Sequence, residues 1–484
     1  MRLVRFTWPL TILVFTILAS FCTAGAEEAT WPAWRGPHRD SKSPDTGLLK
    51  SWPKGGPKKL WEVQGIGNGY SSVTLDGGLV YITGRKPHAD EKIEYEEPPR
   101  HIWQIKGQGF YISTIDEATG EVKQSKDVAN AYYEKIHPDG RHENLSYKGT
   151  RASITIEEDR LYIATGLGEI MCLKKDTFER VWTRNVQEEE FDSGVVGHGW
   201  GYAESVLIYK DKAIYCTGGE KTFMVALDKM TGKTLWKSPP NGQSQYGSTI
   251  FADVDGAPML VNGSRVGLMG VHAETGKELW RYEFAKDNMA NCNTPIYSDG
   301  LVFWACGYGK GGICLKMTAN GQKVTAAKAW QTKDADCHHG GMILHEGHLY
   351  GNNKSGFVCL EFKTGKTIWD SRDLDKDAET IPKGSVCWAD DMFYVFAEKA
   401  GEMFLCECNP KGFKIKGHFF AEGFADESGW TKEYDRTMGP SWAHPVVAGG
   451  KLYLRHFNKV YCYDVETHRI ASGTGPSRKS LSGS

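Results

Sequence analysis

The chain repeats one short arrangement of apolar and polar positions eight times. Each copy begins with small or polar residues and continues into short apolar stretches that are separated by polar turns. One such turn is Ser298-Asp299-Gly300, and the stretch that follows it is Leu301-Val302-Phe303-Trp304. Alternating apolar positions between turn residues at this spacing are typical of antiparallel strands. We therefore expect each copy to fold as a four-stranded antiparallel sheet.

The most regular part of the repeat is the turn between the third and fourth strands of each copy. It is a Thr-Gly or Asn-Gly turn, and a Trp usually follows it. The clearest examples are Thr231-Gly232 with Trp236, Thr275-Gly276 with Trp280 and Thr364-Gly365 with Trp369. A unit that recurs at roughly 40 to 55 residues cannot bury its apolar face alone and has to stack on its neighbours. The pattern predicts an all-β fold, an eight-bladed β-propeller of four-stranded antiparallel blades.

The two ends of the chain suggest how the ring closes. The last copy lies close to the C-terminus and leaves no room for a strong fourth strand. The segment Lys59-Leu60-Trp61-Glu62-Val63 has the pattern of a fourth strand with its Trp, but no blade precedes it. Pairing this segment with the last copy would leave no free sheet edge. We therefore expect an N-terminal strand to close the propeller.

The first residues have the features of an export signal. Arg2 and Arg5 precede an apolar run, and Ala24-Gly25-Ala26 forms a small-residue cleavage site. The apolar run is too short for a stable membrane span. We predict a signal peptide at 1–26, an N-terminal arm at 27–58 packed on the outside of the ring, the propeller at 59–470, and a flexible C-terminal tail at 471–484. The mature protein is expected to be secreted or periplasmic and monomeric.

Three stretches interrupt the repeat and are expected to form long loops. They span residues 86–108, 124–148 and 421–441, and they are rich in charged, aromatic and Pro residues. Loops of this length in a compact domain are usually functional or mobile.

Charge and cysteine content narrow the function. The formal net charge of −2 provides no basic surface for nucleic acid. Cleavage after residue 26 would remove Cys22 and leave an odd number of cysteines. Because several cysteines recur at the same apolar strand position, we interpret them as buried thiols. Disulfides Cys292–Cys306 and Cys406–Cys408 remain alternatives.

The Leu-Asp, Thr-Gly-Lys and Trp pattern resembles the repeat of the pyrroloquinoline quinone (PQQ)-like propellers. That family includes quinoprotein alcohol dehydrogenases and the propeller lipoprotein of the outer-membrane barrel assembly machinery. The N-terminal segment of this chain, Trp31-Pro32-Ala33-Trp34-Arg35-Gly36-Pro37, is similar to that of secreted family members from planctomycete-type bacteria. The dehydrogenases carry adjacent cysteines and a Glu/Asn/Asp set for calcium, and no adjacent cysteines occur here. Asn291 or Asn293 with Asp334 or Asp336 could imitate part of that set. No motif, however, assigns any of the family's catalytic residues to positions of this sequence.

The eight openings are expected to surround one mouth of the central channel, because the innermost strands of a propeller converge there. Their residues include imidazoles, flat aromatic rings and a guanidinium, which suit a planar or anionic ligand. Any one of them could instead cap a strand or fill the hub. The candidate ligand-binding residues are Tyr70, Arg151, His198, Trp200, Tyr246, Asn291, Asn293, His338, His339, Trp388, Trp442 and His444. Converging neutral imidazoles of His198, His338 and His339 could bind a divalent metal.

These observations predict a secreted propeller that binds a partner protein or a small ligand at its central funnel without catalysing a reaction. The alternative is a PQQ- and calcium-dependent alcohol or sugar dehydrogenase, as the family resemblance implies. A carbohydrate-binding propeller is a third interpretation, based on the aromatic loops. Apart from PQQ with calcium in the alternative, no cofactor is predicted.

Overall fold

The computed structural model describes residues 29–87, 93–96, 103–136, 149–191, 200–354, 356–373, 380–398, 401–421 and 440–467. The predicted signal peptide at 1–26 and the predicted tail at 471–484 lie outside these residues and stay predictions. No helix in the described part of the chain is both long and apolar enough to cross a membrane.

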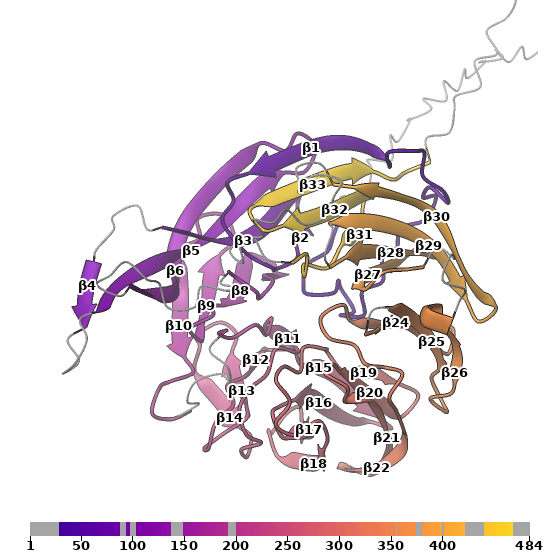
Figure 1. Cartoon of the computed structure of the whole chain (residues 1–484). Helices are drawn as coiled ribbons and strands as arrows, with labels where there is room; N and C mark the ends of the chain where they lie inside the picture. The colour runs from indigo at the N-terminus through magenta and orange to yellow at the C-terminus, as the bar shows by residue number, and fades with distance from the viewer. Residues whose placement is uncertain are drawn as a thin grey trace, which may run out of the picture.

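Eight antiparallel sheets follow one another around a ring, so the predicted eight-bladed propeller is confirmed (Figure 1). Blade 1 contains β2 (Thr74–Asp76), β3 (Leu79–Pro87), β5 (Trp103–Asp116) and β6 (Val122–Ile136), with the short β4 (Ile93–Glu96) paired to β5. Blade 2 contains β7 (Thr155–Glu157), β8 (Arg160–Ala164), β9 (Glu169–Lys174) and β10 (Arg180–Asn185). Blade 3 contains β11 (Leu207–Tyr209), β12 (Lys212–Cys216), β13 (Met224–Asp228) and β14 (Thr234–Lys237). Blade 4 contains β15 (Ile250–Val254), β16 (Ala257–Gly263), β17 (Gly267–His272) and β18 (Glu278–Glu283).

The second half of the ring repeats this order. Blade 5 contains β19 (Ile296–Ser298), β20 (Leu301–Cys306), β21 (Gly311–Asn320) and β22 (Lys323–Thr332). Blade 6 contains β23 (Met342–His345), β24 (His348–Asn353), β25 (Gly356–Glu361) and β26 (Thr367–Asp370), followed by the 3₁₀ turn η2 (Ser371–Asp373). Blade 7 contains β27 (Gly384–Ala389), β28 (Met392–Ala397), β29 (Glu402–Asn409) and β30 (Gly412–Phe420). Blade 8 contains β31 (Val446–Ala448), β32 (Lys451–His456), β33 (Lys459–Asp464) and β1 (Lys58–Gln64).

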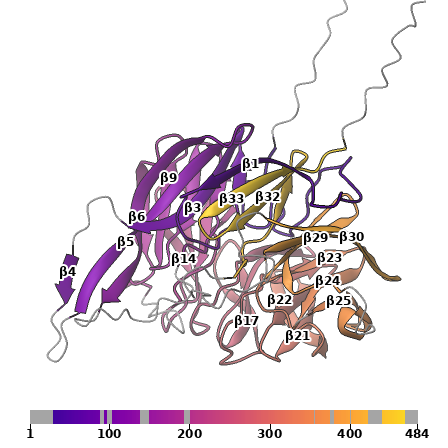
Figure 2. The ribbon, with the colours of Figure 1, turned by 45° about the horizontal axis from the view of Figure 1, so that its top comes forward.

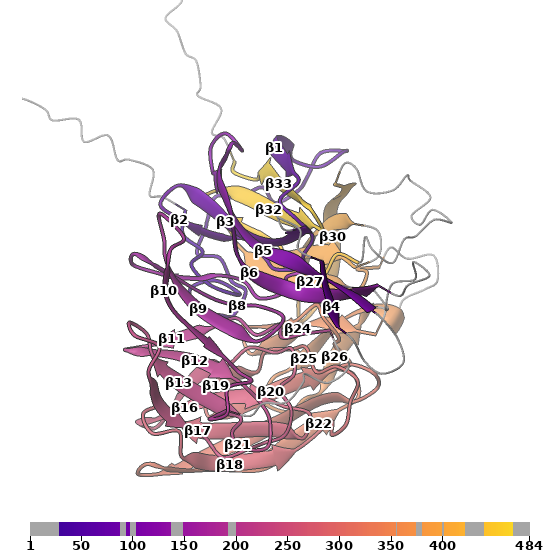
Figure 3. The same ribbon diagram turned by 90° about the vertical axis from the view of Figure 1, so that its left-hand side faces the viewer.

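The N-terminal strand closes the ring as predicted. Strand β1 pairs antiparallel with β33, and Trp61 lies opposite Cys462. Figure 3 shows the indigo β1 beside the yellow β33 at one end of the molecule. This pairing supplies the fourth strand that the last repeat lacks.

The fourth-strand tryptophans lie between neighbouring blades. The indole N–H of Trp236 in blade 3 donates to the Ala273 carbonyl of blade 4 at 3.2 Å. Its ring covers Gly276, where an added Cβ would lie 2.3 Å from the indole and where φ is +67°. Trp61, Trp182, Trp330 and Trp369 donate in the same way to the next blade. Only glycine fits beneath the ring at this turn, which explains why the Thr-Gly pair recurs with the Trp.

Trp280 departs from this arrangement, because its N–H contacts Met259 Sδ at 2.9 Å within its own blade. The corresponding turn of blade 5, Asn320-Gly321, follows the ten-residue strand β21. This turn therefore lies too far out for the Trp280 indole to reach a carbonyl of blade 5. The Met259 sulfur accepts the indole N–H instead.

Blade 1 corrects the loop prediction for part of 124–148. Residues up to Ile136 belong to β6, a strand of 15 residues that pairs with the 14-residue β5. These two long strands project from the ring with β4 near their far end (Figure 2). The prediction was wrong because the charged and polar residues of β6, several of which are exposed, resemble a loop in sequence.

The N-terminal arm corrects a second prediction. Residues 31–43 lie in the centre of the ring rather than on its outside, because they contact the first strand of several blades. Trp31 pairs with Leu75 of β2, Arg35 donates to the Met342 carbonyl of β23 at 2.6 Å, and the Ser43 N–H donates to the Trp388 carbonyl of β27 at 2.8 Å. Only the end of the arm reaches an outer strand, where the Trp52 N–H donates to the Lys416 carbonyl of β30. Buried arginines hold the central part, since carbonyls at converging strands need donors.

The cysteines fit the buried-thiol interpretation. All eleven that the structure describes are free, and ten of them are buried. Neither alternative disulfide, Cys292–Cys306 or Cys406–Cys408, is formed. Cys292 differs from the others because it is partly exposed.

Candidate functional site

A cavity of about 280 Å³ lies where the segments that precede the first strands of the blades converge. Its size is close to the lower end of small-molecule pockets, about 300 Å³. Eight of the predicted ligand-binding residues line it: Tyr70, Arg151, Trp200, Tyr246, His338, His339, Trp442 and His444. They come from six blades, so the ring itself brings distant residues together.

The other four predicted residues are not among those that line the cavity. His198 lies outside the described residues. The Asn293 amide donates to the Cys337 carbonyl at 2.7 Å, and the Asn291 amide donates to the Ser264 carbonyl at 3.2 Å. The Trp388 ring packs on His345 at a centroid distance of 4.5 Å. These three side chains hold neighbouring segments in place.

Flat rings form much of the cavity wall. The His339 imidazole stacks on the Trp442 indole, with centroids 4.0 Å apart and planes 21° apart. Tyr70 contacts the same indole at 5.2 Å. Trp34 of the arm meets His444 edge to face at 4.7 Å and donates its N–H to Thr294. Sequence reasoning missed Trp34, because it placed the arm outside the ring.

Two charged side chains, Arg151 and Glu398, line the cavity among the described residues. Glu398 is the only Asp or Glu among the described lining residues, and it pairs with Lys383 at 2.5 Å. It also accepts the Trp442 indole N–H at 3.2 Å. The Arg151 guanidinium lies over the Tyr70 ring at 5.4 Å and donates to the Gly149 carbonyl. Burial lowers the pKa of Arg151, but a guanidinium remains protonated in proteins.

The three histidines of the cavity are neutral at physiological pH. Burial, assisted by Lys383, lowers the pKa of His338 to about 3. Burial, with Arg35 nearby, lowers the pKa of His444 to about 3 as well. The pKa of His339 lies well below its ordinary value because of burial and the neighbouring His338. With the histidines neutral, Arg151 is the cationic side chain among the described lining residues.

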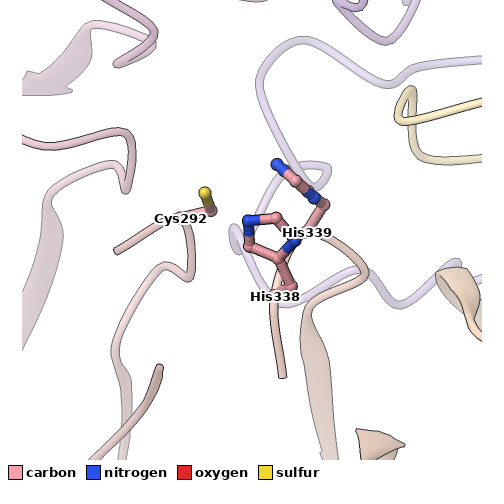
Figure 4. A group of neighbouring side chains, drawn as sticks. All are labelled: Cys292, His338 and His339. Carbon is pink, nitrogen blue, oxygen red and sulfur yellow. The ribbon is translucent and has the colours of Figure 1, made fainter. Parts of the chain in front are cut away.

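Two of these imidazoles approach a thiol. Atoms of Cys292, His338 and His339 that could bind a metal all lie within 4.8 Å of one another (Figure 4). The predicted metal set contained His338 and His339, but the structure adds Cys292 to them and does not describe His198. Cys292 stands in the opening of blade 5, next to that of blade 6, so its place in the repeat was the available signal.

A partly buried histidine outside the cavity makes stability depend on pH. His456 contacts the Ser441 hydroxyl at 3.2 Å, and burial lowers its pKa to about 3. Between about pH 6.5 and pH 3 the unfolded chain binds a proton there that the folded chain does not, so this contribution is complete above pH 6.5 and decreases as the pH falls.

We expect His456→Gln to reduce the loss of stability between pH 7 and pH 5 by about 2 kcal/mol. Urea unfolding of both proteins at each pH measures it. The same change at the exposed His38 is the control, and equal pH dependence in all three proteins would contradict the prediction.

Comparison with known proteins agrees with the architecture. Residues 108–371 match the profile of a family described as outer membrane protein assembly factor BamB. A segment of 162 residues is 26% identical to the quinoprotein ethanol dehydrogenase of Pseudomonas aeruginosa, and it covers 30% of this chain and 25% of that enzyme. The chain thus matches about a quarter of the length of this relative.

Two solved structures share the fold. The quinohemoprotein alcohol dehydrogenase ADHIIG of Pseudomonas putida HK5 is 11% identical, with a TM-score of 0.55 over 91% of this chain and 81% of the enzyme. The computationally designed Ika8 protein is 9% identical, with a TM-score of 0.50 over 84% of this chain and 100% of that protein. At these identities the likeness concerns the fold alone.

Proposed function

The chain belongs to the PQQ-like propeller family described as outer membrane protein assembly factor BamB, and we propose that it is a secreted or periplasmic, monomeric protein that binds a small planar anion in its central cavity without transforming it. The family description names an assembly factor, whereas a protein similar to this chain is a dehydrogenase. The family alone therefore does not distinguish binding from catalysis, and the proposal rests on the residues of the cavity.

The observation that carries the proposal is the combination of aromatic walls with Arg151. Stacked rings such as Trp442 and His339 favour a flat ligand, because a π surface packs best against another flat surface. The guanidinium beside them favours a carboxylate, sulfonate or phosphate on that ligand. Glu398, the carboxylate among the described lining residues, is paired with Lys383.

A dehydrogenase centre with PQQ and calcium does not fit the described residues. Calcium takes six to eight oxygen ligands, whereas Glu398 is the only Asp or Glu among the lining residues described. Asp336 accepts the Gly309 N–H, and Asp334 accepts the Thr367 hydroxyl. Together with the Asn291 and Asn293 amides, these side chains serve local hydrogen bonds. The oxygen set that the family resemblance suggested is therefore not gathered in the cavity, and binding is the better-supported function.

Two matched fluorescent probes test the proposed function. Anilinonaphthalene sulfonate and uncharged phenylnaphthylamine share their aromatic groups and differ by one sulfonate. We expect the anion to bind at least tenfold more tightly to the wild-type protein. Arg151→Met is expected to weaken anion binding by about 10- to 100-fold, or about 1.4–2.8 kcal/mol, and to leave the neutral probe unchanged.

Titrations in the presence of a chelator provide the measurement, and Arg281→Met is the matched control, because Arg281 is an exposed residue of β18. Equal affinity for the two probes, or the same anion affinity in both variants, would reject the proposal. Dye-linked ethanol oxidation after addition of PQQ and calcium would instead support the dehydrogenase function.

A further inference from the structure

We propose that Cys292, His338 and His339 form a site for Zn²⁺ in the wall of the cavity. The site goes beyond anion binding and does not require it. It replaces the three-histidine set that the sequence suggested with one thiol and two imidazoles. These donors come from two adjacent openings, the thiol from the segment before β19 and the imidazoles from the segment before β23.

The geometry places the three donors at a distance that one ion can bridge. Their ligand atoms all lie within 4.8 Å of one another. Zinc bonds of about 2.0 Å to nitrogen and 2.3 Å to sulfur separate tetrahedral donors by roughly 3.3–3.7 Å. Small side-chain rotations would therefore bring the donors together. Figure 4 shows the Cys292 sulfur on one loop and the two rings on the facing loop.

Unsatisfied nitrogens give an independent reason to expect a ligand at this place. His338 Nε2 and His339 Nδ1 are buried and have no hydrogen-bond partner among the described residues. An unpaired buried polar atom costs about 1–3 kcal/mol, and such atoms are rare in folded proteins. A bound cation would satisfy both imidazoles at once.

The donor set selects the class of metal. Calcium and magnesium prefer oxygen ligands, whereas thiolate and imidazole suit zinc and related metals. Neutral imidazoles are the form that binds metal, and burial keeps both rings neutral. Burial also raises the pKa of Cys292 to about 12, so zinc binding near neutral pH would release the thiol proton.

Two positively charged side chains lie near the proposed zinc site, so the negative charge of a Cys292 thiolate would help to hold the ion. Arg151 and Lys383 both lie close enough to disfavour protonation of His339, so they also disfavour a cation at this place. Glu398 offsets Lys383 through its ion pair, and the Cys292 thiolate would offset one charge of the zinc ion. Three protein donors leave a fourth position for water or for an anion. A ligand anion could therefore bind zinc and Arg151 together.

Cobalt provides a spectroscopic test on the full mature chain. We expect the chelator-stripped protein to bind one Co²⁺ with a thiolate-to-cobalt absorption band in the near ultraviolet and the visible bands of tetrahedral cobalt. Zinc should displace the cobalt. Cys292→Ser should lose the thiolate band, and His338→Gln and His339→Gln should each weaken zinc binding at least tenfold. His348→Gln, a change at a partly exposed histidine of β24 away from the cavity lining, should behave as wild type.

A second measurement needs no variant. Zn²⁺ should protect Cys292 from alkylation by iodoacetamide in the wild-type protein, as peptide mass mapping would show. Absence of a thiolate band together with unprotected Cys292 would overturn the proposal, as would a thiolate band that persists in Cys292→Ser. The probe titrations with chelator do not depend on zinc, so failure of this site and failure of the anion-binding function are distinguishable.

Discussion

Replacing Trp61 by alanine is expected to lower the free energy of unfolding by about 3–5 kcal/mol, the usual cost of truncating a buried aromatic side chain. Trp61 is 7% exposed, and its N–H donates to the Glu117 carbonyl of blade 1 at 2.9 Å. Its ring also covers Gly120. Because β1 joins the N-terminal segment to the last blade, this residue stabilises the place where the two ends of the ring meet. The midpoint of guanidinium unfolding, with its slope, measures the effect.

Trp369→Ala is the matched control for this prediction. Trp369 also lies in a fourth strand and donates to the next blade, at the Asn409 carbonyl. It is more exposed than Trp61, and the chain runs continuously between the two blades that it joins. We expect a smaller loss of stability and no weakening of ring closure. Equal losses in the two variants would show that β1 has no special role in closing the ring.

The repeat predicted the architecture well because the same packing of a tryptophan over a turn glycine recurs between blades. A glycine turn, covered by the tryptophan of the preceding blade and followed by a tryptophan that reaches the next blade, identifies the blade edge in the amino-acid sequence. The orphan segment around Trp61 predicted the closure for the same reason. Residues 124–136 were harder to predict, since the long strand β6 follows no repeat and its exposed polar residues resemble a loop.

The candidate site was predictable only in part. Convergence of the openings correctly grouped residues as distant in sequence as Tyr70 and Trp442, because the ring geometry determines where each opening lies. The geometry does not determine which way a side chain points, so Asn291 and Asn293 could not be distinguished from true lining residues. Trp34 depends on the path of the arm, and that path depends on two buried arginines rather than on any repeated pattern.

The second large loss of stability is expected from replacing Arg35 of the N-terminal arm. Arg35 is 3% exposed, and its guanidinium donates to the Met342 carbonyl at 2.6 Å and to the Ser41 hydroxyl at 2.7 Å. Arg35→Ala would leave these buried acceptors without their donor, at about 1–3 kcal/mol each, and would also remove the packing of the side chain. We expect a total loss of about 3–5 kcal/mol of unfolding free energy, measured by guanidinium unfolding.

The same variant should alter the cavity, because Arg35 directly follows Trp34, which forms part of the cavity wall. Once Arg35 no longer holds the arm, proteases should cleave residues 31–43 faster, and both fluorescent probes should bind more weakly. His38→Ala is the control within the same segment, since His38 is exposed and should leave cleavage and binding unchanged. If Arg35→Ala destabilised the protein without faster cleavage of the arm, the arginine would stabilise blade 6 rather than hold the arm in the channel.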